Sequence, residues 1–277
     1  MVFPYAHAEP DRKQSHPHPN PPLDGQGPKG DHVRLTRAYV DCVLAVGNHV
    51  ALSEDVAKHL VRVLRLAHGD SCTLFNGDGR DYEARIISAN KREVLAEVIS
   101  ASEVDNESPL RITLLQGIAR GEKMDLIVQK ATELGVTAIL PVISERSEVK
   151  LDAERAEKRC GHWRSVAISA CEQSGRARIP EIAMPQLLQA GANLVAVDAI
   201  KLILDPAGEH SVSNLELQVT AGIVIAIGPE GGWSPRDRQT LQAGGFVGLR
   251  MGPRILRTET AGLAAITAVQ ARFGDLG

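Results

Sequence analysis

The stretch "GIVIAIGPEGGWSPRD", residues 222–237, predicts a strand, a turn and a helix, and it indicates the fold of the second half of the chain. The composition of its first part predicts a buried strand, and Gly228–Gly232 follow where that strand ends. Ser234 as N-cap, Pro235 at the first helical position and Asp237 at the third predict a helix directly after the turn. Free backbone N–H groups at such a place bind ligands, so the glycines favour a binding turn over a purely structural one.

The surrounding pattern alternates short apolar strands with helices from residue 110 onward. Strands are expected at 111–118, 136–143, 201–206, 222–228 and 246–252, and helices at 122–135, at 152–175 (perhaps in two pieces) and at 258–273. Short, nearly all-apolar strands separated by helices indicate a largely parallel sheet covered on both faces, hence an α/β fold. Ligands bind beyond the carboxyl ends of the strands in such sheets. The turn does not match the dinucleotide fingerprint or the P-loop.

Residues 33–105 read as a smaller β-rich domain. Asn-Gly and Asp-Gly between apolar runs at 72–88 predict a hairpin, and "REVLAEVIS" is expected to pair beside it. A helix is expected from Ser53, as its cap, to Gly69. On that helix Lys58, Arg62 and Arg65 share one face, which is either a phosphate-contacting stripe or an ordinary solvated surface.

The composition narrows the classes of protein to which the chain can belong. Residues 1–32 are rich in Pro, Gly and His and are expected to be disordered, and the polar stretch 102–109 reads as a linker. No apolar run has the length of a membrane helix, so a protein without membrane contact is expected. Four cysteines without CxxC pairing favour the reducing cytoplasm and argue against a metal site. The net charge of -3 hides a basic region, since 111–180 holds 12 Lys and Arg against 9 Asp and Glu.

Three further clusters of polar residues lie near expected strand or helix ends. "LRMGPRILRTETAG", 249–262, combines Arg257 and Glu259 with Thr258, which is expected to cap the last helix. "ISACEQSGRARIP", 168–180, places Glu172 and Arg176 at a helix end, and "ARGEKMD", 119–125, carries Arg120 and Lys123. Helix capping explains Thr258 and Glu259 but not both Arg254 and Arg257, and such a density of charged and capping residues just outside a strand is typical of a site.

These motifs together resemble the 16S ribosomal RNA uridine-N3 methyltransferases, the ribosomal RNA small subunit methyltransferase E family of the SPOUT superfamily. The resemblance runs from about residue 33 to the C-terminus and rests on "RGEKMDLIVQKATELGV", "EQSGR", "IGPEGGWS" and "MGPRILRTETA". The chain departs from the usual pattern in having Trp233 where the family has Phe and Met251 where it has Leu. Residues 1–32 have no counterpart in the resemblance.

The resemblance implies a domain order, a cofactor and a partner. Residues 33–105 should form a PUA-like RNA-binding β-barrel, and 106–277 an α/β methyltransferase domain with a deep trefoil knot around Met251–Arg257. S-adenosyl-L-methionine should be the methyl donor, 16S rRNA of the small ribosomal subunit the substrate, and a homodimer the working form. Backbone of two turns should hold the cofactor, through Gly228, Pro229, Glu230, Gly231, Gly232, Met251, Gly252, Ile255, Leu256 and Thr258.

The chemistry of uridine N3 sets the expected catalytic groups. The nitrogen must lose a weakly acidic proton while negative charge on the flanking carbonyl oxygens is stabilised, and no metal is needed. The candidates are arginines for the charge and glutamates for the proton: Arg257, Arg176, Arg120, Glu172 and Glu259. The expected RNA contacts are Lys58, Arg62, Arg65 and Lys123. Two alternatives stay open, a SPOUT enzyme acting on a ribose 2'-hydroxyl and a non-catalytic RNA-binding assembly factor.

Overall fold

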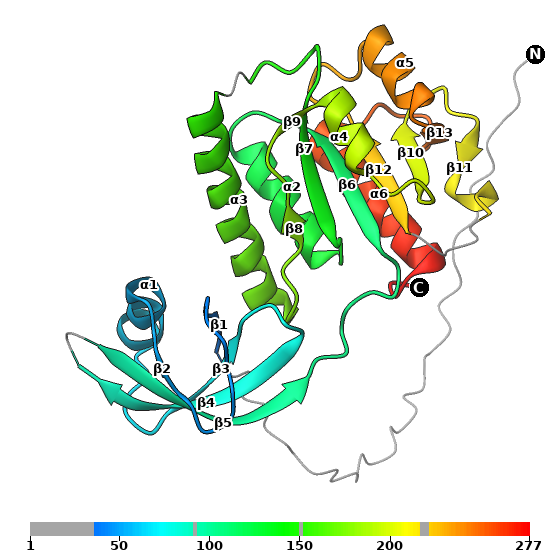
Figure 1. Cartoon of the computed structure of the whole chain (residues 1–277). Coiled ribbons are helices and arrows are strands. Elements are labelled where there is room, and N and C mark those ends of the chain that lie inside the picture. Colours follow the sequence, from blue (N-terminus) through cyan, green and yellow to red (C-terminus); the bar gives the residue numbers. More distant parts are fainter. Residues whose placement is uncertain (1–35, 91–92, 150–151, 217–221) are drawn as a thin grey trace, which may run out of the picture. The chain divides into compact units, whose positions relative to one another are not determined.

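The computed structural model describes residues 36–90, 93–149, 152–216 and 222–277. They all belong to one compact unit, Leu35–Gly277 (Figure 1). The extension 1–32, for which disorder is expected, lies outside the described residues. Within the described parts, no helix is both long and apolar enough to cross a membrane.

A five-stranded sheet forms the first part of this unit. Its strands are β1 (Arg37–Tyr39), β2 (His49–Ala51), β3 (Ser71–Phe75), β4 (Arg80–Ala89) and β5 (Val94–Glu103), in the order β1-β3-β4-β5-β2. The predicted hairpin is confirmed, because β3 pairs antiparallel with β4 and β4 with β5. Alternate residues of these strands, among them Leu74, Ala84 and Ile86, are buried in a core of their own.

The helix expected between Ser53 and Gly69 is shorter than predicted. Helix α1 (Glu54–Ala57) continues as the π-helical segment η1 (Lys58–Val63), and the Ser53 side chain makes no capping bond. The Leu64 N–H bonds to the His59 carbonyl, five residues back, which unwinds the helix where it ends. Arg65 therefore lies beyond it with a φ of 62°, and the prediction that Arg65 continues the stripe of Lys58 and Arg62 is wrong.

The second part is the parallel sheet that the apolar strands predict. Its strands are β6 (Ile112–Gly117), β7 (Ala138–Ile143), β8 (Glu181–Ile182), β9 (Gln186–Leu187), β10 (Ile200–Leu204), β11 (His210–Ser211), β12 (Ile223–Ile227) and β13 (Val247–Arg250). The order is β11-β13-β10-β12-β6-β7-β8, with β9 also on β7, and every pair is parallel. Strand β12 lies in the middle, and all five of its residues are buried.

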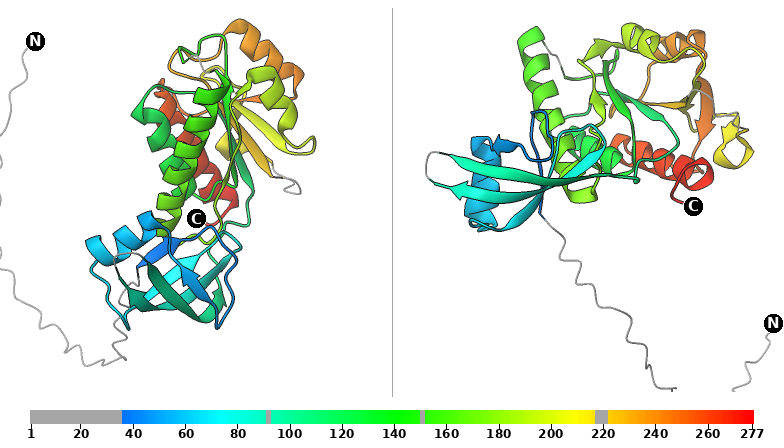
Figure 2. Two further views of the ribbon diagram at one scale, coloured as in Figure 1. Left: turned by 60° about the vertical axis from the view of Figure 1, so that its left-hand side comes forward. Right: turned by 60° about the horizontal axis from the view of Figure 1, so that its bottom comes forward.

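Helices cover both faces of this sheet (Figures 1 and 2). They are α2 (Glu122–Glu133), α3 (Ala153–Ser174), α4 (Leu188–Leu194), α5 (Pro235–Ala243) and α6 (Thr258–Phe273), with the short 3-10 turn η2 (Val212–Asn214). One core joins α2, α3 and α6 to the sheet, and a second joins α4 and α5 to it. Leu114 and Leu115, neighbours on β6, face these two different cores because side chains alternate along a strand.

Helix boundaries follow local signals at several of the predicted places. The predicted apolar face of α2, including Met124 and Ile127, is buried, and Gly135 follows that helix with a φ of 83°. Helix α3 is a single continuous helix, so the alternative of two pieces is wrong, and it ends at Gly175 with a φ of 85°. Strand order alone does not describe how the chain threads through itself, so the trefoil knot stays a prediction.

Candidate cofactor pocket

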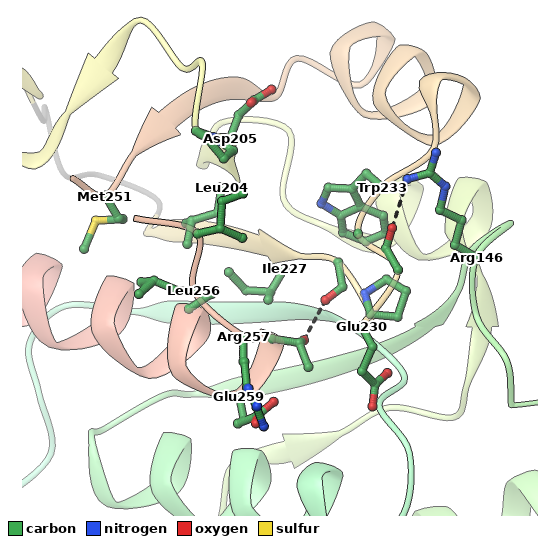
Figure 3. Close-up of a pocket in the computed structure, with 18 of the residues that line it drawn as sticks. Arg146, Leu204, Asp205, Ile227, Glu230, Trp233, Met251, Leu256, Arg257 and Glu259 are labelled. Atoms are coloured by element: carbon green, nitrogen blue, oxygen red, sulfur yellow. Dashed lines mark hydrogen bonds between the residues drawn. The ribbon is translucent and has the colours of Figure 1, made fainter. Parts of the chain in front are cut away.

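A cavity of about 540 Å³ opens at the carboxyl ends of β10, β12 and β13 (Figure 3). Its size falls in the range of small-molecule sites. All ten residues predicted to hold a cofactor line it, together with Lys123, Arg257 and Glu259. The structure therefore brings the two turns, which follow β12 and β13, together with the start of α2, which lies more than a hundred residues earlier in the sequence.

The glycine turn forms one wall because side chains do not fit there. A Cβ on Gly228 would lie 3.0 Å from backbone atoms of Gly232, and Gly232 itself has a φ of 64°. Gly117, at the end of β6, packs against the same turn, since a Cβ there would lie 2.6 Å from the ring of Pro229. These close approaches fix the path of the turn between β12 and α5.

The predicted capping box after the turn is confirmed. The Ser234 hydroxyl accepts a hydrogen bond from the Asp237 N–H at 3.0 Å, and the Asp237 carboxylate accepts one from the Ser234 N–H at 2.9 Å. The Ser234 hydroxyl also donates to Glu145 Oε2 at 2.5 Å. Helix α5 thus starts at a fixed place, and the preceding glycine backbone is held at the pocket wall.

The second turn is joined to the first through Thr258. Its hydroxyl donates to the Gly228 carbonyl oxygen at 2.6 Å (a dashed line in Figure 3) and accepts from Gln116 Nε2 at 3.0 Å. The prediction that Thr258 caps the last helix is wrong, because α6 begins at Thr258 itself and Arg257 occupies the cap position without a side-chain bond. The buried hydroxyl instead ties the two turns together.

Charged side chains surround the mouth of the cavity. Lys123 Nζ lies 3.3 Å from Glu230 Oε1 and 4.0 Å from Glu259 Oε2. Partial burial works to raise the pKa of Glu230, but hydrogen bonds from the Arg120 and Glu230 backbone and from Lys123 outweigh it, so the net pKa is lowered. Glu259 Oε2 is buried and accepts no hydrogen bond from the described residues. Lys123, predicted to contact RNA, thus lies between two pocket carboxylates.

The predicted arginines lie in three different environments. Arg257 lines the cavity and is exposed, next to Glu259 in Figure 3. Arg120 lies beside the site without lining it, with its N–H bonded to Glu230 Oε1 at 3.0 Å and its guanidinium paired with Glu148. Arg176 is buried away from the cavity, with 4 % of its surface exposed. Only Arg257 of the three has a guanidinium at the pocket.

Glu172 and Arg176 belong to a different part of the structure. Glu172 Oε1 accepts a hydrogen bond from the Tyr39 N–H at 3.0 Å, in the five-stranded part. The Arg176 guanidinium binds both carboxylate oxygens of Glu107, at 2.6 and 3.1 Å, and the carbonyls of Thr132 and Val136. The geometry does not place either residue at the reaction site, because these polar groups are used where the protein packs against itself.

Several lining residues escape the sequence motifs. Leu204 ends β10, and Asp205 and Pro206 follow it. Arg146 comes from the loop after β7, and Arg238 from α5. Arg146 donates to the Gly231 carbonyl at 2.9 Å, and Arg238 pairs with Asp205. The residues at the end of β10 could be found from the sequence, because the ends of parallel strands meet at one edge of a sheet. Nothing local in the sequence marks Arg146 as a neighbour of Gly231.

The predicted RNA-contacting pair on the smaller part lies at a second cavity. Lys58 and Arg62 line it with apolar residues such as Leu52 and Val61, and two acids, Glu54 and Glu93, also border it. The described residues contain no group of three or more His, Cys, Asp or Glu side chains that could hold a metal ion. All four cysteines are free thiols.

Comparison with known proteins identifies the family of this chain. The chain matches the model of the RNA methyltransferase domain over residues 106–270 and that of the RNA methyltransferase PUA domain over 52–99. It is 33 % identical over 243 residues to ribosomal RNA small subunit methyltransferase E of Buchnera aphidicola, covering 88 % of this chain and 98 % of the relative. The Bacillus subtilis protein of that name is 32 % identical over 79 % of this chain and 88 % of its own.

Solved structures agree with the sequence relatives. A Neisseria gonorrhoeae ribosomal RNA small subunit methyltransferase E bound to S-adenosyl methionine matches with a TM-score of 0.83 and 41 % identity, over 88 % of this chain and all of that one. A Legionella pneumophila protein with the bound cofactor SAM matches with a TM-score of 0.84 and 40 % identity over the same shares. With the parallel sheet, the paired turns and the preceding PUA domain, the chain belongs to the ribosomal RNA small subunit methyltransferase E family.

Proposed function

We propose that this chain transfers a methyl group from S-adenosyl-L-methionine to N3 of a uridine in 16S rRNA. The observation that carries the proposal is the cavity formed by two backbone turns joined through the Thr258–Gly228 hydrogen bond. Two structures at 40 % and 41 % identity contain the same cofactor, which supports its assignment to this cavity. We also propose the cytoplasm as the place of the reaction, because the proposed substrate is ribosomal RNA.

The residues of the cavity fit this cofactor. Leu204, Ile227, Leu249, Met251 and Leu256 provide an apolar wall for an adenine ring and a thioether chain. The same cavity contains carboxylates and cations, which suit the ammonium and the carboxylate of an amino acid. When bound, S-adenosylmethionine supplies an electrophilic methyl group. The protein must hold the uracil ring against that group and keep water away from it.

Different side chains at the mouth of the cavity are proposed to stabilise the negative charge and to accept the proton. Arg257 is placed to stabilise negative charge on the uracil oxygens, because its guanidinium lines the cavity. Glu259 is the candidate for accepting the N3 proton, since its buried Oε2 has no hydrogen-bond donor among the described residues. Lys123 Nζ lies 4.0 Å from that oxygen.

Two of the five catalytic candidates are withdrawn from this proposal. Arg176 and Glu172 lie at contacts within the protein, so neither is assigned a step. Arg120 acts through Glu230, whose carboxylate accepts its backbone N–H. The proposed catalytic groups are therefore Arg257 and Glu259, with Lys123 and Arg120 orienting their neighbours.

The substrate must be presented as an unpaired base. N3 lies on the Watson–Crick edge, so the uridine has to be extruded or already single-stranded. We assign Lys58 and Arg62 on the smaller part to RNA phosphates. We also propose that the protein works as a homodimer, as the family resemblance implies.

Nucleoside analysis of 16S rRNA from cells with and without this protein tests the proposal. We expect N3-methyluridine to disappear from one position when the protein is absent, and purified protein to restore it with S-adenosylmethionine. A lost 2'-O-methyl group would establish the ribose alternative instead. Normal RNA binding without any cofactor binding in calorimetry would establish the non-catalytic assembly factor.

A further inference from the structure

The "EQSGR" motif and the residues after it, Glu172–Arg178, form what is here called the docking segment. It lies at the C-terminal end of α3, next to β1 in Figures 1 and 2. The Tyr39 N–H donates to Glu172 Oε1 at 3.0 Å, and Arg37 Nη2 donates to the Arg176 carbonyl at 3.0 Å. Strand β1 is thereby bonded to the methyltransferase domain by its backbone and by a side chain.

The hairpin turn between β3 and β4 is part of the same contact. The Gly79 N–H donates to the Ala177 carbonyl at 3.2 Å. A Cβ added to Gly79 would lie 2.6 Å from a guanidinium nitrogen of Arg178, and Gly79 has a φ of 97°. The Asn-Gly-Asp-Gly sequence of this turn therefore leaves room for the docking segment in addition to reversing the chain.

Arg176 extends the contact into the methyltransferase domain. Its guanidinium makes a two-pronged ion pair with Glu107 in the connecting segment, and Asn106 Nδ2 donates to the Gly175 carbonyl at 2.7 Å. The same guanidinium donates to the Thr132 and Val136 carbonyls, at 2.8 and 3.0 Å, where α2 ends. A paired, buried guanidinium resists displacement, because breaking one partner leaves an unpaired buried charge.

Helix α2 connects this contact to the pocket. Thr132 lies in its last turn and Lys123 in its first, about 14 Å apart at the rise of an α-helix. Lys123 lines the cavity and lies near both Glu230 and Glu259. One short, rigid helix thus separates the residues that hold the PUA domain from those that meet the substrate.

We infer that Glu172 and Arg176 are positioning residues for RNA: they fix the distance between the RNA-contacting surface of the PUA domain and the methyl-transfer pocket. The inference rests on the proposed function, since it takes RNA as the ligand of both parts. A fixed spacing raises the effective concentration of the second contact once the first has formed. Loosening the docking segment weakens RNA binding without changing the chemistry at a saturated site.

The test uses Glu172→Ala, which removes the acceptor of the Tyr39 N–H, and Glu172→Gln, which keeps an acceptor oxygen but cannot take a proton. Glu157→Ala is the matched control, because Glu157 is exposed on the same helix. The measurements are KM and kcat with small ribosomal subunits, RNA affinity by filter binding, S-adenosylmethionine affinity by calorimetry, and the melting temperature of each variant.

We expect KM for the RNA substrate to rise about tenfold in Glu172→Ala, with kcat and cofactor affinity within twofold of the unchanged protein. Glu172→Gln should restore KM, and Glu157→Ala should match the unchanged protein. An unchanged KM and RNA affinity in folded Glu172→Ala would overturn the inference. A kcat lost equally in the Ala and Gln variants would overturn it as well, since it would return Glu172 to proton transfer.

The two proposals fail in different ways. If the unchanged protein transfers no methyl group, the proposed function fails, and the filter-binding comparison still decides whether Glu172 sets RNA affinity. If methyl transfer is normal but Glu172→Ala binds RNA like the unchanged protein, the positioning role fails and the proposed function stands.

Discussion

The Thr258 hydroxyl donates a 2.6 Å hydrogen bond to the Gly228 carbonyl and so joins the start of α6 to the end of β12. Thr258 is 6 % exposed, and its hydroxyl also accepts from Gln116. The two turns that form the cavity are thus connected through one side chain. A substitution that removes this hydroxyl should therefore loosen the contact between the two turns.

Thr258→Val should weaken S-adenosylmethionine binding about tenfold. The substitution removes the donor to the Gly228 carbonyl and one of the two acceptors of the Gln116 amide, a loss of about 1–3 kcal/mol. Calorimetry measures the affinity. Thr258→Ser retains the hydroxyl and serves as the control, and equal binding by both variants would remove this hydrogen bond from the account of the pocket.

Gly117→Ala should lower the free energy of unfolding by about 1–3 kcal/mol and weaken cofactor binding too. The added Cβ would lie 2.6 Å from the Pro229 ring, so β6 or the glycine turn must shift. Gly161→Ala is the matched control in α3, where a Cβ meets nothing within 4 Å and the change should stabilise the helix by about 1 kcal/mol. Denaturant unfolding measures the free energy of unfolding of both variants. Equal changes at the two sites would contradict the prediction.

Arg257→Lys should lower the methyl-transfer rate about a hundredfold with cofactor affinity nearly unchanged. Lysine keeps the charge but loses the planar fork that can address two oxygens together. Single-turnover methylation and cofactor titration separate the two effects. Arg250→Lys, at an exposed arginine outside the cavity, is the control. A variant with a normal rate but a weakened dimer would assign Arg257 to assembly instead.

Glu230→Gln should make the stability of the folded protein depend less on pH in the acid range. Because the pKa of Glu230 is lowered in the folded protein, its ionised form stabilises the fold above the ordinary carboxyl pKa. That stabilisation is lost as the pH falls from the ordinary carboxyl pKa through the lowered pKa of the folded protein. Melting curves over this range should therefore fall more steeply for the unchanged protein than for the variant. Parallel curves would show that Glu230 gains nothing from Lys123 and the Arg120 N–H.

The four cysteines should differ in reactivity toward a thiol reagent. Burial raises the pKa of Cys72 to about 11 and that of Cys171 to about 12, so neither offers a thiolate at neutral pH. Cys42 is exposed, although burial and Asp41 raise its pKa somewhat. Labelling followed by peptide mass analysis should find Cys42 modified first. Cys72 or Cys171 reacting at the same rate in folded protein would contradict their burial.

Sequence patterns predicted those parts of the fold that local chemistry controls. Strand β12 and helix α6 could be predicted because nearly continuous apolar runs lie between clear breakers. The helix predicted at 53–69 is too long, because the observed helix ends in a π-helical turn at Val63, beside the buried Leu60. Propensity gives way there to tertiary contacts, which no local window contains.

The site shows the same division between local and long-range information. The family resemblance implies that the two turns form one pocket, and they do line one cavity, at the edge where the ends of parallel strands meet. Arg176 was grouped with them by its charge and its place at a helix end, yet its guanidinium is directed to Glu107 and two carbonyls. A buried ion pair and a catalytic arginine have the same sequence signature, so only the three-dimensional structure separates them.

The pairing of β6 with β12 has a consequence for how the chain is made. Ile112 of β6 is matched with Ile223 of β12, so two neighbours in the middle of the sheet are 111 residues apart in a chain of 277. During synthesis β6 and β7 emerge long before β12, and one edge of β6 must wait unpaired. Pairing over such a separation is slow, and the pocket also needs Thr258 near the end of the chain. A nascent chain therefore presents its PUA domain first and completes the cavity only when translation is almost finished.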